Sequence, residues 1–541
     1  MELLTIDVET TMNASEKMGK AHPMYPENRI VATGIKRNND PAITFTTLIP
    51  RLGPVNIDFL VGCNLSFDLS YIYKDPMCTN KANLQSQRLW DIQLAEYLLS
   101  GQQNKWPSLD EMATKYGLPL KDSKVSEYFD KGLGAEHVPK ELLDLYLRHD
   151  LEVTEAIALK QITEATQTKQ LDLIISQMEA LHCTTEMMFN GLCIDYDYLV
   201  KYASEVATEY ADLKIKIEHD VQHFVNDWKF CLVEDVDSSL QWSKFLFGGT
   251  IKEHGSEIVG VYKNGKPKSK KTTTEKFLAG VCDVSPQADW LSEKTGRVSV
   301  DDKTLEVLKK ETKIPSLREL LETLHSYREL AKQLSTYIQG LSKHVIKKAF
   351  ISRWGKEGSL VEFDFSQLEV AILAHVTTDL QLIDDISKGR DIHSELFNQM
   401  YMRFPSKEER KWFKRLTFGL IYGAGAKTLA ENAGCNVDVA KEFIRTFYNR
   451  YPGVQLWNIN IERRSREESK YLDGETIKTW KLKTETGRLY VFKEYLSKFS
   501  STKTHTFSPT ELKNYPIQGL ATGDIVPMML GILFRKLVGR E

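Results

Sequence analysis

Asp7 and Glu9 are two carboxylates whose spacing suits metal binding. They lie in the segment TIDVETT, which we predict to be a strand, and residues two apart on a strand point to the same face. Side-by-side carboxylates repel each other unless a cation lies between them, and the neighbours Leu3, Leu4 and Ile6 indicate a half-buried strand. A divalent cation that prefers oxygen ligands, Mg²⁺ or Mn²⁺, resolves both problems. The alternative is an exposed edge strand whose acids are solvated.

Two later segments carry further acids. NLSFD, residues 64–68, places Asp68 at a predicted junction between a strand and a helix. YLRHD, residues 146–150, places Tyr146 and Asp150 four apart, on one face of a predicted helix. In this order the three segments resemble the motifs of the DEDD-type 3′→5′ exonucleases, in which one metal ion activates water and another stabilises the departing 3′ oxygen.

This resemblance implies a role for each matching residue. Four acids are expected to hold the two metal ions: Asp7, Glu9, Asp68 and Asp150. Tyr146 is expected to orient the attacking water, and Asn64 and Phe67 are expected to support the site.

A second chemical pattern lies in SKEERKWFKRLTFGLIYGAGAKTL, residues 406–429. Arg410, Lys414, Phe418 and Tyr422 recur every four residues, so on a helix they form one slowly drifting stripe. Cations this close repel each other but suit a polyphosphate lying along the helix, and the aromatic rings can stack on a base. The alternative is a basic solvent face with aromatic residues in the core.

Together with DFSQLE, residues 364–369, this stripe resembles motifs A and B of the A-family DNA polymerases, the bacterial DNA polymerase I class. NYPIQGLATGDI, residues 514–525, resembles the family segment that contacts the primer-template. A start directly at the nuclease motifs is similar to the phage members. The resemblance implies a template-directed DNA polymerase with a proofreading exonuclease and two Mg²⁺ ions, or Mn²⁺, in each site.

Two other functions stay open at this point. One is a 3′→5′ exonuclease whose polymerase half only binds DNA and is inactive without a complementing C-terminal chain. The other is a non-enzymatic, DNA-binding remnant.

The resemblance also implies roles in the polymerase half. Asp364 is expected to bind both catalytic metal ions, and Arg410 and Lys414 the β- and γ-phosphates of an incoming deoxynucleoside triphosphate. The other expected contacts are His393 near the phosphates, Phe418 and Tyr422 around base and sugar, Gln367 beside the nucleotide, Glu369 at the sugar 2′ position, and Asn514 and Gln518 on the primer-template. Ser366-x-x-Glu369 also has the pattern of a capping box, which gives Glu369 a second possible duty.

Three departures from the family pattern stand out. A segment that the family has before motif A is not recognised, Ala371 stands where motif A usually has Arg, and motif C does not follow Gln518 before Glu541. We therefore expect the partner acid of Asp364 to come from a second polypeptide or from a C-terminal region outside these residues. We also expect one apolar helix face to be left exposed, namely Val526, Met529, Leu530 and Leu533.

The elements that position these residues predict a multidomain α/β and α+β protein. Residues 1–165 are expected to form a ribonuclease H-like exonuclease domain. Residues 166–345 are expected to form a largely helical palm entry and thumb. Residues 346–541 are expected to form the palm and fingers of an incomplete right-hand polymerase, with a strand over 358–364 that delivers Asp364.

Composition limits the remaining functions. The chain has 541 residues, a net charge of −3 and no long apolar run, so we expect several domains, local rather than global DNA contacts, and no membrane span. One candidate DNA contact is the Lys-rich segment 263–276, which we predict to be a loop or hairpin tip and whose alternative is a solvated linker. No signal peptide is recognised, and the seven cysteines form no CxxC pair, which favours a reduced cytoplasm, that of a bacterial host if the gene belongs to a phage.

Overall fold

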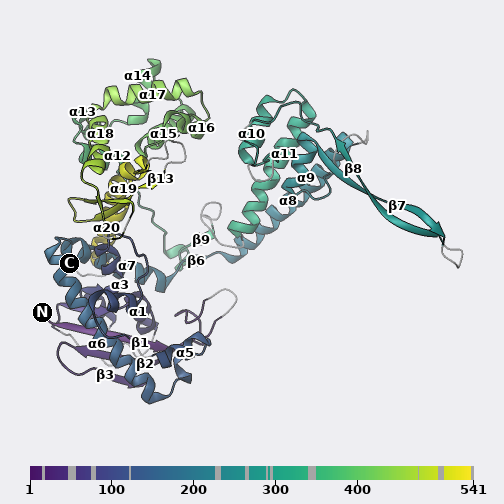
Figure 1. Cartoon of the computed structure of the whole chain (residues 1–541). Coiled ribbons are helices and arrows are strands. Elements are labelled where there is room, and N and C mark those ends of the chain that lie inside the picture. Colours follow the sequence, from purple (N-terminus) through teal and green to yellow (C-terminus); the bar gives the residue numbers. More distant parts are fainter. Residues whose placement is uncertain are drawn as a thin grey trace. The chain divides into compact units, whose positions relative to one another are not determined.

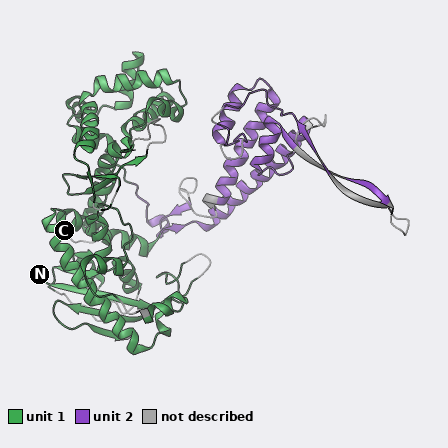
Figure 2. Cartoon of the chain, in the orientation of Figure 1, with its two compact units in different colours: residues 1–191, 363–541 green, residues 192–362 purple. Residues whose placement is uncertain are grey.

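Residues 1–191 and 363–541 form one compact unit, unit 1, and residues 192–362 form another, unit 2 (Figures 1 and 2). The boundaries predicted after residues 165 and 345 separate domains by their expected functions, which compact units do not test, so they stay predictions. The computed structural model describes the whole chain except residues 15–18, 47–55, 75–80, 121–122, 226–232, 262–266, 288–289, 293–296, 339–348, 473, 475, 497–504 and 538–541.

A five-stranded sheet begins unit 1. Its order is β3-β2-β1-β4-β5, with β1 antiparallel to β2 and parallel to β4. Leu3, Leu4 and Ile6 are buried, so the half-buried strand predicted around Asp7 is confirmed. The strands are β1 (Leu3–Thr10), β2 (Ile30–Arg37), β3 (Ile43–Thr46), β4 (Phe59–Gly62) and β5 (Leu89–Asp91).

Helices pack on this sheet and share its core. Gly34 of β2 allows the closest approach, because a Cβ there would lie 2.6 Å from Leu151 of α6 and 2.9 Å from Leu147. The segment 88–100, which reads as helical throughout, in fact begins as β5, because Leu89 and Trp90 pair with β4 and are buried. The helices are α1 (Leu65–Lys74), α2 (Lys81–Ser86), α3 (Ile92–Leu99), α4 (Leu109–Tyr116), α5 (Ser123–Asp130), α6 (Lys140–Gln167) and α7 (Leu171–Asn190).

The second part of unit 1 is mainly helical and has its own core. A small antiparallel sheet, β10-β11-β12, packs on α18 and α19 through a separate aromatic cluster. The helices are α12 (Leu368–Thr377), α13 (Leu380–Ser387), α14 (Ile392–Tyr401), α15 (Lys407–Ile421), α16 (Ala426–Ala433), α17 (Val437–Arg450), α18 (Pro452–Glu467), α19 (Pro509–Gln518) and α20 (Val526–Leu537). The strands are β10 (Lys470–Tyr471), β11 (Lys478–Lys483), β12 (Leu489–Lys493), β13 (Tyr495–Leu496) and β14 (His505–Thr506).

A π-helical turn, Gly519–Ile525, joins α19 to α20. Such a wide turn leaves backbone carbonyls without the usual helical partner. The carbonyl of Gly523 instead accepts hydrogen bonds from Gln177 and Arg488, both at 2.8 Å. Arg488 also donates to Asp524 at 2.5 Å, and both side chains are buried. Helix α7 and the residue that directly precedes β12 therefore fix this turn.

Helix α20 packs along α7 of the first part of unit 1 (Figure 1). Phe534 stacks on His182 at 5.9 Å, and Arg535 pairs with Glu179. The stretch Pro509–Leu537 is long and apolar enough to cross a membrane by length and composition alone. About a third of its most apolar stretch is buried, and α20 packs on α7.

The expectation of an exposed apolar face on α20 is wrong. The exposed apolar residues of α20 are instead Met528, Ile532 and Leu537. The four residues of the expected face are half-buried: Val526, Met529, Leu530 and Leu533.

Unit 2 is a helical bundle with a long hairpin (Figure 2). Its core includes the pair Tyr210 and Tyr327, whose hydroxyls lie 2.6 Å apart. The Lys-rich segment was predicted to be a loop or hairpin tip. It does belong to a hairpin, because β7 pairs with β8, but residues 267–276 lie in strand β8, and residues 262–266 lie outside the described residues. The elements are β6 (Cys193–Ile194), α8 (Tyr196–Val225), α9 (Ser239–Phe247), β7 (Gly249–Val261), β8 (Pro267–Leu278), α10 (Asp302–Glu311), α11 (Pro315–Lys332), a π-helical turn (Gln333–Ile338), β9 (Phe350–Ile351) and a 3₁₀ turn (Gly355–Glu357).

The expected strand over 358–364 is not a strand. In the described part of the chain these residues join no sheet, and Leu360, Val361 and Phe363 are exposed. A strand is stable only when a neighbouring strand pairs with its backbone, so an apolar pattern does not suffice.

The Arg488–Asp524 pair gives a stability prediction. Asp524→Ala leaves the buried guanidinium without its carboxylate, which costs roughly 3–5 kcal/mol of unfolding free energy. Glu467→Ala, which breaks the exposed pair with Arg463, is the control and costs at most about 0.5 kcal/mol. Urea unfolding of the full-length variants measures both, and equal losses would contradict the prediction.

Candidate active sites

Carboxylates from the sheet and from α6 meet in unit 1. Asp7 and Glu9 lie on β1, and Asp150 lies on α6, with ligand oxygens that all lie within 4.8 Å of one another. Gly34 lets α6 approach closely enough for this. Oxygens at this separation suit a shared divalent cation. In the part of the chain that the structure describes, no other group of three metal-ligating side chains converges in this way.

Asp68 lies in the first turn of α1 beside this cluster. Its side chain is buried and accepts a hydrogen bond from the backbone N–H of Val8 at 3.0 Å. Burial, and then the charge of Asp7, raise the pKa of Asp68 well above its usual value, although the Val8 bond opposes this. A bound cation would offset both effects.

Asp91 supports this arrangement, and its role was not predicted. Its carboxylate caps α3 by accepting from Gln93 and Leu94, and it accepts from the backbone of Leu65 at 2.7 Å. It therefore fixes the start of α1 and with it Asp68. An Asp directly before a helical pattern is a helix-start signal that could have revealed the cap, but the sequence does not show the contact across 26 residues.

Tyr146, the predicted water-orienting residue, lies one turn before Asp150 on α6 and packs edge-on against Phe129 at 6.2 Å. Asn64 directly precedes α1 in a left-handed conformation with φ of 60°. Asn64 and Phe67 line a cavity of about 830 Å³, together with Lys105 and Trp106. A cation and exposed aromatic rings in one cavity suit a nucleotide strand.

The predicted stripe lies on α15, which starts at Ser406 with a capping box to Glu409. The ammonium of Lys414 lies 5.5 Å from the ring centre of Phe418, and the rings of Phe418 and Tyr422 are 6.0 Å apart. The structure therefore brings the cation and the aromatic residues together on one side of the helix.

His393 on α14 faces the same stripe. Its ring lies 5.7 Å from Phe418, and its Nδ1 lies 3.1 Å from the hydroxyl of Thr417. Burial lowers the pKa of His393 to about 4, with Arg410 and Lys414 acting in the same direction and Asp391 opposing. The ring is therefore neutral at pH 7.

Glu369, Tyr422 and Gln518 meet from three different helices. The amide of Gln518 donates to the hydroxyl of Tyr422 at 3.4 Å. Burial and the nearby Glu369 raise the pKa of that hydroxyl, and the bond from Gln518 opposes this. The predicted nucleotide and primer-template residues thus lie side by side.

The expected capping box at Ser366 is wrong. Gln367, not Ser366, is the N-cap of α12, and its backbone is left-handed with φ of 53°. The helix start has no side-chain capping hydrogen bond from Ser366 or Glu369. Glu369 thus has no capping duty.

Asp364 lies in an exposed extended segment and is not part of the carboxylate cluster. Asn514 on α19 is half-buried, and its side-chain oxygen finds no hydrogen-bond partner within the described residues.

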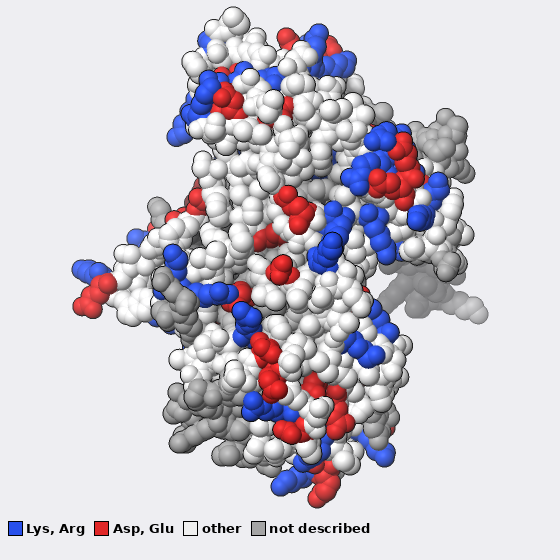
Figure 3. Space-filling model, turned by 90° about the vertical axis from the view of Figure 1, so that its left-hand side faces the viewer, with Lys and Arg blue, Asp and Glu red and all other residues white. Residues whose placement is uncertain are grey.

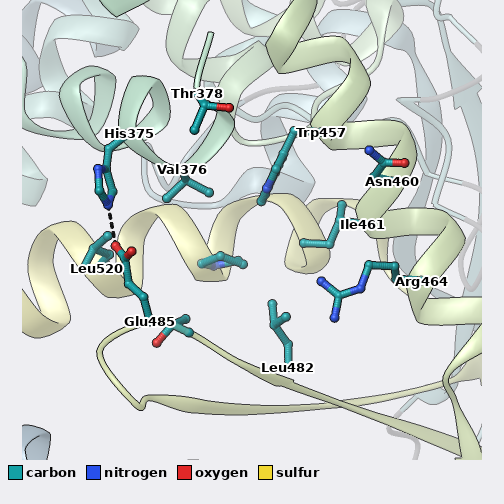
Figure 4. A pocket seen from close by; sticks show the side chains of 12 residues that line it. His375, Val376, Thr378, Trp457, Asn460, Ile461, Arg464, Leu482, Glu485 and Leu520 are labelled. Atoms are coloured by element: carbon teal, nitrogen blue, oxygen red, sulfur yellow. Dashed lines mark hydrogen bonds and ion pairs between the residues drawn. The ribbon is translucent and has the colours of Figure 1, made fainter.

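Two further surfaces are distinct from these clusters. A mainly apolar cavity of about 440 Å³ lies between the end of α12, α18 and β11 (Figure 4). His375 contacts Glu485 at 2.5 Å in its wall, and Trp457 also lines it. None of the predicted site residues lines it. On the face shown in Figure 3, cations and anions are intermixed.

Residues 343–539 match the family model described as DNA polymerase family A. The chain is similar to proteins described as DNA polymerase I. DNA polymerase I of Helicobacter pylori (strain ATCC 700392 / 26695) is 26% identical over 435 residues, which cover 71% of this chain and 43% of that protein. The thermostable DNA polymerase I of Thermus aquaticus is 28% identical over 209 residues, 31% of this chain and 24% of that protein.

A solved structure described as the POL domain of Pol1 from M. smegmatis, in complex with DNA primer-template and dNTP, has a similar fold. The TM-score is 0.65 at 17% identity, and the alignment covers 99% of this chain and 86% of that one. The predicted mixed α/β, polymerase-like fold is thus confirmed, and the ribonuclease H-like assignment stays a prediction. The chain matches less than half the length of the Helicobacter relative.

His393 gives a pH prediction. Its folded-state pKa of about 4 lies below the unfolded value of 6.5, so the unfolded chain binds more protons between these values and stability is lost as the pH falls through this window. From pH 7 to pH 5 this amounts to about 2 kcal/mol. Urea unfolding should show that His393→Gln removes this part of the pH dependence, whereas His137→Gln, at an exposed histidine, leaves it unchanged. An unaltered profile in His393→Gln would refute the assignment.

Proposed function

We propose that this chain is a template-directed DNA polymerase with a 3′→5′ proofreading exonuclease, acting in DNA replication. Both reactions are phosphoryl transfers, for which two divalent cations, Mg²⁺ or Mn²⁺, stabilise the attacking and leaving oxygens. The observation that carries the proposal is the convergence of Glu369, Tyr422 and Gln518 beside the cationic stripe of α15, within the region that matches family A.

In the proposed polymerase site, each residue has a role that follows from its charge and shape. Lys414 is placed to attract a triphosphate, and its contact with Phe418 fixes where that charge lies. Phe418 and Tyr422 offer ring faces for the base, and Glu369 restricts the sugar. Neutral His393 supplies a hydrogen bond and no charge.

In the nuclease site, Asp7, Glu9 and Asp150 would hold the metal ions, with Asp68 beside them. The three antiparallel strands followed by two parallel strands support the ribonuclease H-like assignment. The adjacent cavity with Lys105 and Trp106 supports a single-stranded 3′ end as substrate.

Asp364 needs a second acid to hold a pair of metal ions. We propose that this acid lies outside residues 1–541, in a continuing chain or a second polypeptide. The alternative, an exonuclease with an inactive polymerase half, is less favoured because the polymerase half keeps its nucleotide residues together. A phage origin and a cytoplasmic location are part of the same proposal.

Mg²⁺-dependent trimming of a 3′-labelled single strand tests the nuclease. Asp7→Ala removes a metal ligand and should lower the rate by more than about a hundredfold. Asp110→Ala, at an exposed acid of α4, is the matched control and should trim normally. Equal rates in the two variants would refute the nuclease site.

Nucleotide binding to the full-length chain on a recessed primer-template tests the polymerase half without requiring a complete metal site. Lys414→Ala should weaken binding of the templated triphosphate about tenfold, because a charge-assisted phosphate contact is lost. Lys427→Ala, on the exposed side of α16, should bind normally. Failure of the wild-type chain to bind the templated nucleotide would refute the proposed polymerase function.

A further inference from the structure

Arg410 lies one turn before Lys414 on α15. One edge of its guanidinium group is bonded to the carboxylate of Asp391. Its Nε donates to Oδ2 of Asp391 at 2.9 Å, and its Nη2 donates to Oδ1 at 2.8 Å. A planar guanidinium bonded in this way presents its remaining nitrogen, Nη1, on another edge. Within the described residues Nη1 makes no further hydrogen bond, and the side chain is 45% exposed.

Asp391 is itself fixed. It is the N-cap of α14 and accepts from both the backbone and the hydroxyl of Ser394, at 3.1 and 2.5 Å. Its neighbour Ile392 is buried, so the helix start is anchored. Burial opposes ionisation, but the hydrogen bonds from Arg410 and Ser394 lower the pKa of Asp391 overall. The carboxylate is thus a charged, immobile partner.

Other acids near the start of α15 are differently engaged. Glu409 pairs with Arg403 and closes the capping box at Ser406. Arg410 therefore has one well-placed carboxylate, and it reaches that carboxylate across 19 residues. A long side chain without such a partner loses its fixed direction.

We propose that Asp391 is a positioning residue for nucleotide binding. It holds the Arg410 guanidinium so that Nη1 faces a triphosphate lying along α15, next to Lys414. This inference rests on the proposed polymerase function and adds a residue to it. The opposite arrangement, in which Asp391 competes with the triphosphate for Arg410, predicts tighter binding when the carboxylate is removed.

Equilibrium titration of the full-length chain on a recessed primer-template with the templated deoxynucleoside triphosphate tests this. Asp391→Asn and Asp391→Ser both keep an N-cap side chain but lose the anionic clamp. Each should raise the dissociation constant of the triphosphate about tenfold and leave that of the DNA unchanged. Asp379→Asn, at the N-cap of α13 with no arginine partner, is the control and should change neither.

A double-mutant cycle separates positioning from a structural role. Arg410→Ala should weaken triphosphate binding, and adding Asp391→Asn should weaken it no further, because the second change acts only through Arg410. Additive losses, unchanged affinity or tighter binding in Asp391→Asn would overturn the inference while leaving the proposed function intact. If the wild-type chain binds no triphosphate, the proposed function fails and the inference fails with it.

Discussion

Both candidate sites hold side chains of like charge close together: carboxylates near β1, and Arg410 and Lys414 on α15. The packing of unit 1 keeps them close although they repel each other. Asp7, Glu9 and Asp150 converge because α6 packs closely on β2 at Gly34. Like charges brought this close repel each other, and the buried core of sheet and helices holds the elements that carry them in place. A divalent cation between the acids, or a phosphate group beside Lys414, would reduce this repulsion.

The two sites use different means to fix their charges. In the first part of unit 1, the clustered acids lie on regular elements, and one buried carboxylate, Asp91, ties α1 to α3. In the second part of unit 1, the cations of α15 have long side chains, so their direction comes from partners such as Asp391 for Arg410 and the ring of Phe418 for Lys414. The position of an Asp or Glu carboxylate is set largely by its backbone, because the side chain is short. The charged end of a Lys or Arg also needs contacts that hold its long side chain in one direction.

The sequence predicted what depends on local pattern. The strand carrying Asp7 and the stripe on α15 follow from periodicity, and the structure shows both. It did not predict contacts between distant segments, such as Asp91 with Leu65. The strand expected at 358–364 was wrong because no neighbouring strand within the described residues pairs with it. The cap expected at Ser366 was wrong because Gln367, in a left-handed conformation, is the N-cap of α12 instead. Sequence patterns describe what a segment favours, but partners elsewhere in the chain decide whether it forms.

The π-helical turn between α19 and α20 sets the rotation of α19 relative to α20 about the helix axis. A wide turn accommodates one residue more than a regular α-helical turn, and one residue corresponds to about 100° of rotation. Deleting a single residue from Gly519–Ile525 would restore a regular helix but turn Gln518 away from Tyr422 while α20 stayed seated on α7. The angular setting of Gln518 relative to α20 is therefore encoded in the length of this segment as well as in its side chains.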